Sequence, residues 1–140
     1  MLTQHAEILI TDTDLAKLRE MTRSLRSSHH PFRQYAGDLE SELGRARVVP
    51  RADVPPDVVT MNSTVRIRDT RSREPEEFTL VYPADSDALD GRISVLAPLG
   101  LAVLGARTGD RIKWQVPAGV RTFTVEAILY QPEAAGDAHL

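Results

Sequence analysis

The histidines and carboxylates of the first third of the chain are the residues whose types could support metal or acid-base chemistry. His29 and His30 are adjacent, so their side chains diverge on a helix or an extended loop, and no further His or Cys lies nearby to complete a metal site. Asp38, Glu40 and Glu42 lie off the apolar stripe of their predicted helix, where carboxylates normally form the solvated face. We therefore predict no catalytic residue and no metal site.

Arginines form a second cluster of side chains with possible chemistry, at positions 66, 68, 71 and 73. They could contact nucleic acid or an acidic partner, but carboxylates at positions 69, 74, 76 and 77 favour local neutralisation. The sequence contains no phosphate-binding glycine loop of the P-loop or kinase type. Its motifs therefore give no support to nucleotide phosphorylation by this chain.

The composition is that of one folded domain, or of a small domain with an appendage. The 140 residues are 41% hydrophobic and 26% charged, with no cysteine and a formal net charge of -3. A negative chain lacks the field for non-specific nucleic-acid binding, so any such contact is local or indirect. The sequence has neither an apolar run of the roughly 20 residues that a membrane helix needs nor a secretory signal. We expect a cytoplasmic protein without membrane contact.

Two apolar stripes at helical spacing define the N-terminal region. The first follows the capping candidates at residues 11–14, and the second follows a break at residues 27–31. The stripe positions are Leu15, Leu18, Thr22 and Leu25, then Phe32, Ala36, Leu39, Leu43 and Ala46. The short connection predicts an antiparallel helical hairpin with a short coiled-coil seam, each arm being about 22 Å long. So thin a seam barely offsets its ordering entropy, and we expect the hairpin to lean on its neighbour.

A polar, proline-bearing passage separates this hairpin from the rest of the chain. It ends in Pro55-Pro56-Asp57, where two prolines remove hydrogen-bond donors and disfavour helix. We predict the hairpin over residues 1–47, a linker over residues 48–58 and a second domain over residues 59–140. Within that domain, a loose tail is predicted from about Glu133.

Beyond the linker the apolar residues alternate with a period of two, which is typical of half-buried strands. Val65 and Ile67 alternate with polar residues, as do Phe78 and Leu80 after a charged turn at residues 69–77, so this region predicts a β-hairpin.

Residues 93–130 predict one helix between further strands. A short strand at residues 93–95 is followed by an apolar helix that begins at Pro98 and by a Gly-Asp turn at residues 109–110. Strands over residues 112–116 and 120–130 complete the unit. The expected fold class is α+β, with an N-terminal antiparallel helical hairpin followed by an antiparallel sheet packed on one short helix.

The second domain resembles the FKBP-like C-terminal domain of the Gre transcript-cleavage factors. The resemblance rests on residues 59–63 (VTMNS), 79–83 (TLVYP), 93–110 (ISVLAPLGLAVLGARTGD) and 129–133 (LYQPE). Two phrases are more narrowly similar to the Rnk type, called regulators of nucleoside diphosphate kinase: DVVTMNS at residues 57–63 and YQPEAAGD at residues 130–137.

The resemblance implies a regulator that binds RNA polymerase at the rim of the secondary channel, with the helical hairpin directed into the channel. In cleavage-active Gre factors the hairpin tip presents carboxylates, because Mg²⁺ prefers anionic oxygen ligands. The tip of this chain holds no carboxylate; its residues include His29, His30, Pro31, Phe32 and Arg33. The resemblance therefore implies occupation of the polymerase entrance without cleavage, in competition with Gre factors and with an effect on nucleoside diphosphate kinase.

The loop before the apolar helix is the docking segment that the resemblance implies. Gre factors carry a motif similar to Ile-Ser-x-Asp-Ser-Pro at this loop. Residues 93–98 here read Ile-Ser-Val-Leu-Ala-Pro, which makes the expected contact more apolar. The residues expected to bind RNA polymerase are Ser94, Leu96, Ala97, Pro98 and Leu99. For Leu96 and Leu99, completion of the hydrophobic core is the alternative.

Two other functions remain open, namely a transcript-cleavage factor and a peptidyl-prolyl isomerase or other interaction module of FKBP-like fold. Most aromatics that could line an isomerase pocket fall on alternating strand positions, as core packing alone requires; they are Phe78, Tyr82, Trp114, Phe123 and Tyr130. We expect no enzyme activity and no cofactor, and we favour a monomer.

Overall fold

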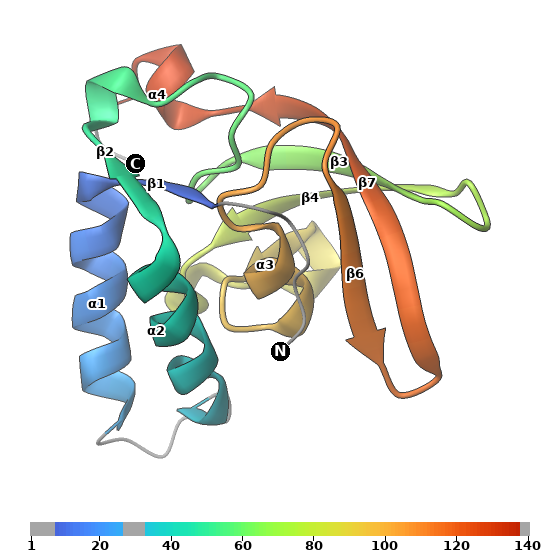
Figure 1. The fold of residues 1–140 in the computed structure, drawn as a ribbon, viewed down its shortest axis with the longest axis horizontal. Helices are drawn as coiled ribbons and strands as arrows, with labels where there is room; N and C mark the ends of the chain where they lie inside the picture. Colours follow the sequence, from blue (N-terminus) through green and yellow to red (C-terminus); the bar gives the residue numbers. More distant parts are fainter. Residues whose placement is uncertain (1–7, 27–32, 138–140) are drawn as a thin grey trace.

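Two helices stand beside a five-stranded sheet (Figure 1). The computed structural model describes residues 8–26 and 33–137. Helix α1 (Asp12–Arg26) and helix α2 (Ala36–Arg45) run antiparallel, and a 3-10 turn, η1 (Arg33–Tyr35), precedes α2. The predicted α+β class and the predicted pair of antiparallel helices are therefore confirmed for the described residues.

Helix α1 begins where its capping residues predict. The Thr11 hydroxyl oxygen accepts a hydrogen bond from the Asp14 N–H at 3.0 Å, which satisfies one of the free donors of the first turn. The predicted stripe is buried at Leu18 and Thr22, and Asp14 extends it by one turn.

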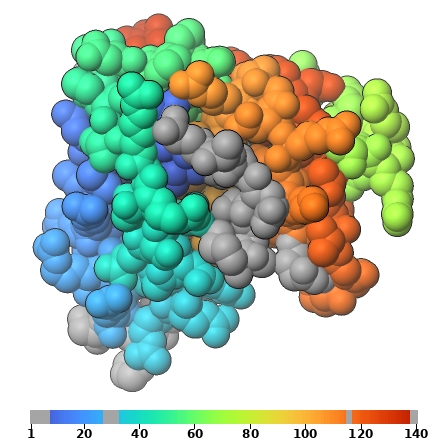
Figure 2. Space-filling view, in the orientation of Figure 1, coloured from blue at the N-terminus to red at the C-terminus, as the bar shows by residue number. Residues whose placement is uncertain are grey.

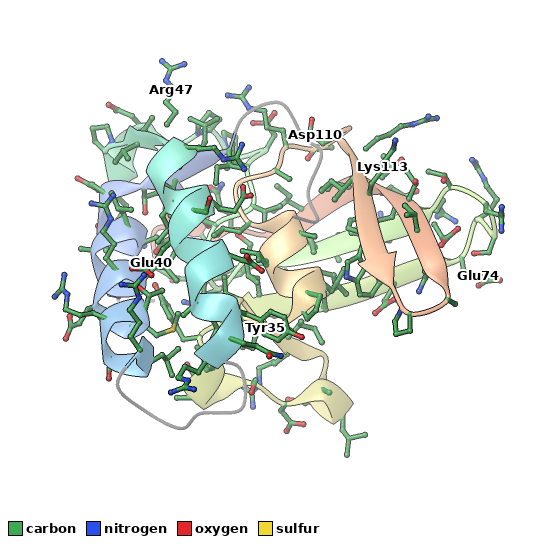
Figure 3. The ribbon with its side chains drawn as sticks, turned by 60° about the horizontal axis from the view of Figure 1, so that its bottom comes forward. Tyr35, Glu40, Arg47, Glu74, Asp110 and Lys113 are labelled. Carbon is green, nitrogen blue, oxygen red and sulfur yellow. The ribbon has the colours of Figure 1, made fainter. Side chains whose placement is uncertain are left out.

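Helix α2 faces α1 with the stripe that its spacing predicts. Leu39 and Leu43 are buried, and Glu40 points towards α1, where Arg26 binds it at 2.7 Å (Figure 3). Glu42, which we assigned to the solvated face, is instead buried and pairs with Arg45 at 2.5 Å. Glu42 precedes Leu43 directly, and both side chains are buried. The buried face of α2 is therefore wider than the apolar stripe that the sequence predicts.

Two short strands that the sequence analysis did not predict flank the helices. β1 (Leu9–Thr11) and β2 (Arg47–Val49) pair in parallel beside the ends of α1 and α2. The Leu9 N–H also donates to the carbonyl of Gly105 at 3.2 Å. Gly105 has φ 76°, and a Cβ there would lie 2.6 Å from the Ile8 Cβ, so only glycine allows β1 to approach this turn.

The large sheet has the order β5-β4-β3-β7-β6. Its strands are β3 (Thr64–Asp69), β4 (Pro75–Val81), β5 (Arg92–Ser94), β6 (Arg111–Val116) and β7 (Gly119–Tyr130). The pairs β3–β4, β3–β7 and β6–β7 are antiparallel, as predicted. The β3–β4 turn projects from the body of the molecule (Figures 1 and 2).

The prediction of a wholly antiparallel sheet is wrong at one edge, because β5 pairs with β4 in parallel. A parallel neighbour requires the chain to return to the end where the previous strand began. Residues 82–91 make this return through two 3-10 turns, η3 (Pro83–Asp85) and η4 (Ala88–Asp90). Gly91, in the left-handed region at φ 71°, then leads into β5.

One hydrophobic core joins the helices to the sheet. Leu18 and Leu39 belong to the same buried cluster as Met61, Leu96 and Ile112. Helix α3 (Pro98–Val103) is buried along almost all of its length, as its apolar sequence predicts. The hairpin therefore leans on the sheet, as predicted, whereas the division at residues 48–58 stays a prediction.

In place of the loose tail predicted from Glu133, residues up to Asp137 are tied to the fold. Helix α4 (Pro132–Ala135) ends at Gly136, which has φ 78°. The Glu133 carboxylate accepts a hydrogen bond from the Thr60 hydroxyl at 2.7 Å. Within the described ranges, none of the helices combines the length and apolar composition that crossing a bilayer requires.

The close approach of Gly100 in α3 to the backbone of β5 gives a first testable prediction. A Cβ at this residue would lie 2.0 Å from the Ser94 carbonyl oxygen, and backbone cannot easily move away. We expect Gly100→Ala to lower the free energy of unfolding by about 2 kcal/mol, measured by urea denaturation.

Gly44→Ala is the matched control, since a Cβ at Gly44 meets nothing within 4 Å. We expect this helical substitution to raise the free energy of unfolding by about 0.5 to 1 kcal/mol. Equal effects of the two substitutions would contradict the packing described for α3.

Candidate functional site

The predicted docking loop between β5 and α3 is a tight, hydrogen-bonded turn. Ser94 is buried, and its hydroxyl oxygen accepts a hydrogen bond from the Leu96 N–H at 3.1 Å. The Ala97 N–H donates to the Ser94 carbonyl at 3.0 Å. Pro98 is the first residue of α3, a position where the missing N–H would have no helical partner. The conformation of this loop is thus set by the fold itself.

Ala97 and Pro98 are the predicted docking residues that reach the surface. Both are half-buried, whereas Leu96 is 0% and Leu99 is 7% exposed. Leu96 and Leu99 belong to the hydrophobic core, so the geometry favours the core alternative for these two residues. A partner at this loop would contact Ala97 and Pro98, and the buried Leu96 and Leu99 would lie beneath that contact.

Most of the predicted hairpin tip lies outside the described residues, namely His29, His30, Pro31 and Phe32. Arg33 is exposed at the start of η1. Across residues 8–26 and 33–137, no group of three or more His, Asp or Glu side chains is placed to hold a metal ion.

One hollow on the described part of the hairpin is lined mainly by positive charge. Arg19, Arg23 and Arg26 line a shallow hollow of about 310 Å³ together with Glu40 and Leu43. Glu40 offsets one of the three cations through its ion pair with Arg26. The hollow therefore lacks the excess of carboxylates that would hold a hydrated divalent cation.

Arg66 and Arg68 of the arginine cluster are neutralised, mainly by a carboxylate from another strand. Glu126 of β7 accepts hydrogen bonds from Arg66 at 2.8 Å and from Arg68 at 2.5 Å. The Arg68 hydrogen bond, followed by that of Arg66, lowers the pKa of Glu126 to about 2. Asp69 pairs with Arg121, also from β7. These ion pairs support the interpretation of local neutralisation.

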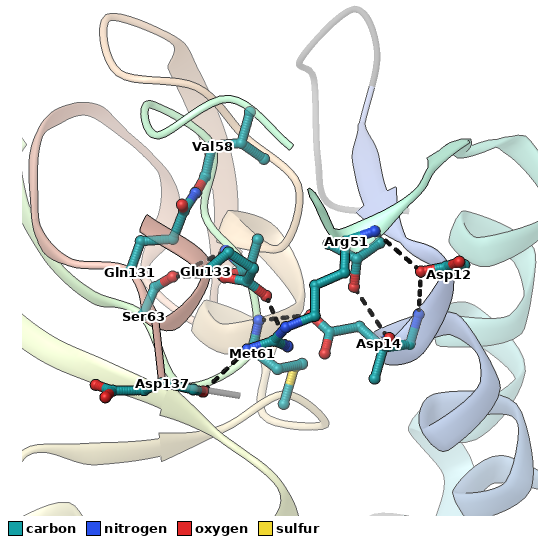
Figure 4. A network of polar contacts seen from close by, with 12 residues as sticks. Asp12, Asp14, Arg51, Val58, Met61, Ser63, Gln131, Glu133 and Asp137 are labelled. Carbon is teal, nitrogen blue, oxygen red and sulfur yellow. Dashed lines mark hydrogen bonds and ion pairs between the residues drawn. The ribbon is translucent and has the colours of Figure 1, made fainter. Parts of the chain in front are cut away.

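A polar network at the junction between the helices and the sheet is the most constrained cluster of charged groups (Figure 4). Asp14 of α1 is 3% exposed, and its carboxylate accepts a hydrogen bond from the Met61 N–H at 3.1 Å. Asp12 accepts a hydrogen bond from the Arg51 N–H at 3.1 Å. The first turn of α1 is thereby attached to the segment after β2 and to the segment before β3.

Arg51 carries the network across to the C-terminal helix. Its guanidinium pairs with Glu133 at 3.4 Å and donates to the Asp137 carbonyl at 3.0 Å. Nearby, the Gln131 side-chain amide donates to the carbonyls of Pro55 and Val58, both at 2.8 Å. Four segments distant in sequence are therefore held at one point.

Burial raises the pKa of Asp14 to about 6, above its ordinary value of 3.8. The hydrogen bond from Met61 opposes this rise, and the nearby Glu133 carboxylate adds to it. The hydroxyl of Tyr82 is buried near these charges without a hydrogen-bond partner among the described residues, and burial raises its pKa as well. The junction thus keeps a carboxylate where its charged form is poorly solvated.

Sequence analysis missed this junction because its members are single polar residues far apart in the chain. Asp14 looked like one of several capping residues, and Glu133 was assigned to a loose tail. One signal was available, because Asp14 stands one helical turn before Leu18 on the apolar face. A carboxylate on that face predicts a buried partner.

Comparison with known proteins matches both parts of the chain. A family model described as "Rnk N-terminus" matches residues 7–49, and one described as "Transcription elongation factor, GreA/GreB, C-term" matches residues 54–130. The "Regulator of nucleoside diphosphate kinase" of Escherichia coli (strain K12) is 41% identical over 131 residues, 93% of this chain and 94% of that protein. The chain belongs to the Rnk family.

The chain is also similar to elongation factors. The "Transcription elongation factor GreA" of Pelobacter propionicus is 36% identical over 67% of this chain and 60% of its own length. The solved structure of a "Prokaryotic transcription elongation factor GreA/GreB from Nitrosomonas europaea" is 42% identical. It matches with a TM-score of 0.70 over 90% of this chain and 100% of that one.

The Rnk match ends where the structure places β2, so β1, α1, α2 and β2 form the unit that the N-terminal model describes. The junction network ties this Rnk unit to the GreA/GreB-like sheet through Asp14, Arg51 and Met61. The family matches thus divide the chain into an Rnk-like and a GreA/GreB-like region, and the hydrogen bonds of Asp12 and Asp14 connect the two.

The raised pKa of Asp14 gives the second prediction. The folded protein binds this proton more tightly than the unfolded chain, so the Asp14 contribution to stability falls as the pH rises from about 4 to about 6. Asp14→Asn keeps an acceptor for the Met61 N–H and removes the charge. At about 1.4 kcal/mol per pKa unit, we expect it to raise the free energy of unfolding at pH 7 by up to about 3 kcal/mol.

Urea denaturation at several pH values measures this effect, and the difference between variant and parent should grow between pH 4 and 6. Asp14→Ala is the control, since it removes both the charge and the acceptor and leaves the Met61 N–H unpaired. We expect a smaller gain from it than from Asn. A less stable Asn variant at pH 7 would refute a costly buried charge.

Proposed function

We propose that this chain is a transcription regulator that binds RNA polymerase at the rim of the secondary channel and does not stimulate transcript cleavage. One observation carries the proposal: a domain of the GreA/GreB elongation-factor family is fixed to a short helical hairpin. The docking part of an elongation factor is thereby combined with an arm that lacks the means for cleavage.

The docking contact is assigned to the surface of the loop before α3, at Ala97 and Pro98. The two residues are half-buried and apolar, and the backbone beneath them is fixed by Ser94. Because the loop is already ordered, little conformational entropy is lost when a partner covers it. Leu96 and Leu99 support this contact from the core.

The hairpin is short, and its described part groups no set of three or more His, Asp or Glu side chains that could deliver a metal ion. Helix α1 has 15 residues, which gives about 22 Å, and its Leu18 is anchored in the body of the protein. Only the last two turns, residues 19–26, extend towards the tip, and they carry three arginines and a single carboxylate, Glu20. Cleavage needs carboxylates that hold Mg²⁺ and position water. Such an arm can still occupy the channel entrance in competition with Gre factors. Nucleic acid is then contacted only indirectly.

The E. coli relative is named a regulator of nucleoside diphosphate kinase. We extend that regulatory effect to this chain and place it at the level of transcription, since the sequence holds no nucleotide-binding motif. An FKBP-like isomerase activity has less support. Phe78 and Phe123 are each 3% exposed, so these aromatics fill the core and do not line a substrate pocket.

Binding to core RNA polymerase provides the third prediction. Ala97→Asp places a charge on the docking loop while supplying α3 with a favoured N-cap residue, so the fold is preserved. We expect it to weaken binding about ten-fold or more in a surface-immobilised binding assay, because a carboxylate would be desolvated in an apolar contact.

Val120→Asp is the matched control, since Val120 is 60% exposed at the start of β7 and lies outside the docking loop. We expect its affinity to equal that of the parent. Stalled elongation complexes with labelled RNA complete the test: the parent should leave the transcript intact and should reduce cleavage by an added Gre factor. Stimulated cleavage, or equal binding of both variants, would contradict the proposal.

A further inference from the structure

A groove of about 720 Å³ runs between α1 and the segment that follows β4. Its apolar lining consists of Met21 and Leu25 from α1 and of Tyr82, Pro83 and Ala84. Met21, Leu25 and Tyr82 pack against the core and are half-buried. The groove thus presents apolar surface that the described part of the chain leaves open.

The walls of the groove are preformed. Asn62 at one edge adopts the left-handed backbone conformation with φ 68°, and its N–H donates to the Leu80 carbonyl at 2.6 Å. At the other edge, the Asp85 N–H donates to the Tyr82 carbonyl at 2.9 Å. A ligand would therefore meet a fixed shape, which lowers the entropy lost on binding.

A leucine stands fully exposed on the turn that follows the groove wall in sequence. Leu89 of η4 has a relative exposure of 102%. Three residues separate it from Asp85 in the groove wall, so their Cα atoms are at most about 14 Å apart. In Figure 3, where the ribbon of η4 is pale yellow, this turn lies at the lower edge of the molecule.

The η4 turn is held rigid although its leucine contacts solvent. The Asp87 carbonyl accepts hydrogen bonds from Asp90 at 3.0 Å and from Arg92 at 2.9 Å, and the Asp87 carboxylate also accepts from the Asp90 N–H. The Gly91 N–H donates to the Ala88 carbonyl at 3.3 Å. A single exposed leucine is ordinary on a protein surface. A leucine fixed on such a turn beside an open apolar groove is a pre-organised contact.

The charges around the groove and the turn are mainly negative. The carboxylates are Glu20, Asp85, Asp87 and Asp90, and the cations are Lys17 and Arg92. Arg92 pairs with Asp90 at 3.6 Å, which leaves carboxylates in excess on this face. Charge complementarity therefore favours a basic partner and disfavours nucleic acid.

We propose that the groove and the η4 turn form one docking surface for a basic amphipathic segment of a partner protein. An apolar side chain of that segment enters the groove beside Tyr82, a second one covers Leu89, and its lysines or arginines face Glu20 and Asp85. This surface goes beyond the polymerase proposal and does not depend on it, since the docking loop contributes no residue to the groove.

The fourth prediction tests this surface by NMR titration of the isotope-labelled full chain. The probe is a peptide of about 12 residues with leucines at helical spacing and lysines on the opposite face. We expect amide shifts confined to α1 residues 17–25, Asn62 and residues 82–92. Leu89→Ser and Asp85→Lys should each weaken peptide binding about five-fold or more, because one removes an anchor and the other reverses a facing charge.

Leu129→Ser is the matched control, since Leu129 is 45% exposed on β7 and does not line the groove. It should leave the affinity unchanged, and a peptide with glutamates in place of the lysines should bind at least about ten-fold more weakly. Absence of binding, shifts spread over other acidic faces, or equal binding of both peptides would overturn the proposal. So would shifts that appear on concentrating the protein alone, which would assign the groove to a second copy of the chain.

Discussion

The fixed attachment of the helical hairpin to the sheet is the constraint on which the rest of the structure depends. The two parts share one core, since Leu18 and Leu39 of the hairpin belong to the same buried cluster as Met61, Leu96 and Ile112. Polar contacts fix the angle that apolar packing alone would leave adjustable, through Asp14 with the Met61 N–H and Arg51 with Glu133. The direction of the hairpin relative to the loop before α3 is therefore a property of the fold.

Local signals in the sequence predicted the elements that local physics decides. Helical spacing gave both arms of the hairpin, the alternation of Val65 and Ile67 gave β3, and Pro98 marked the start of α3. The misses all require partners distant in the chain. β1 is three residues long and exists because it pairs with β2, and β5 is parallel because residues 82–91 carry the chain back across the edge of β4.

The site was predicted in part for the same reason. The loop before α3 could be located from its residues, but their division into surface and core could not, since Leu96 and Ala97 are adjacent and only packing distinguishes them. Asp14 and Glu133 carry no local mark of burial, because a carboxylate near a helix start or in a terminal segment is normally solvated. Their role depends on the meeting of four separate segments, which no window of sequence contains.

The buried carboxylate at the junction is better explained by orientation than by stability. Its pKa of about 6 means that the charged form is destabilised at neutral pH, so Asp14 makes the fold less stable than a neutral acceptor would. An apolar residue would avoid that cost but would leave the Met61 N–H without a partner inside the protein. The carboxylate accepts that N–H and also lies in the field of Arg51, so it favours one docking angle over others of similar apolar burial. For the proposed function, that angle sets the direction of the two turns of α1 beyond Leu18, which are the part that extends towards the hairpin tip.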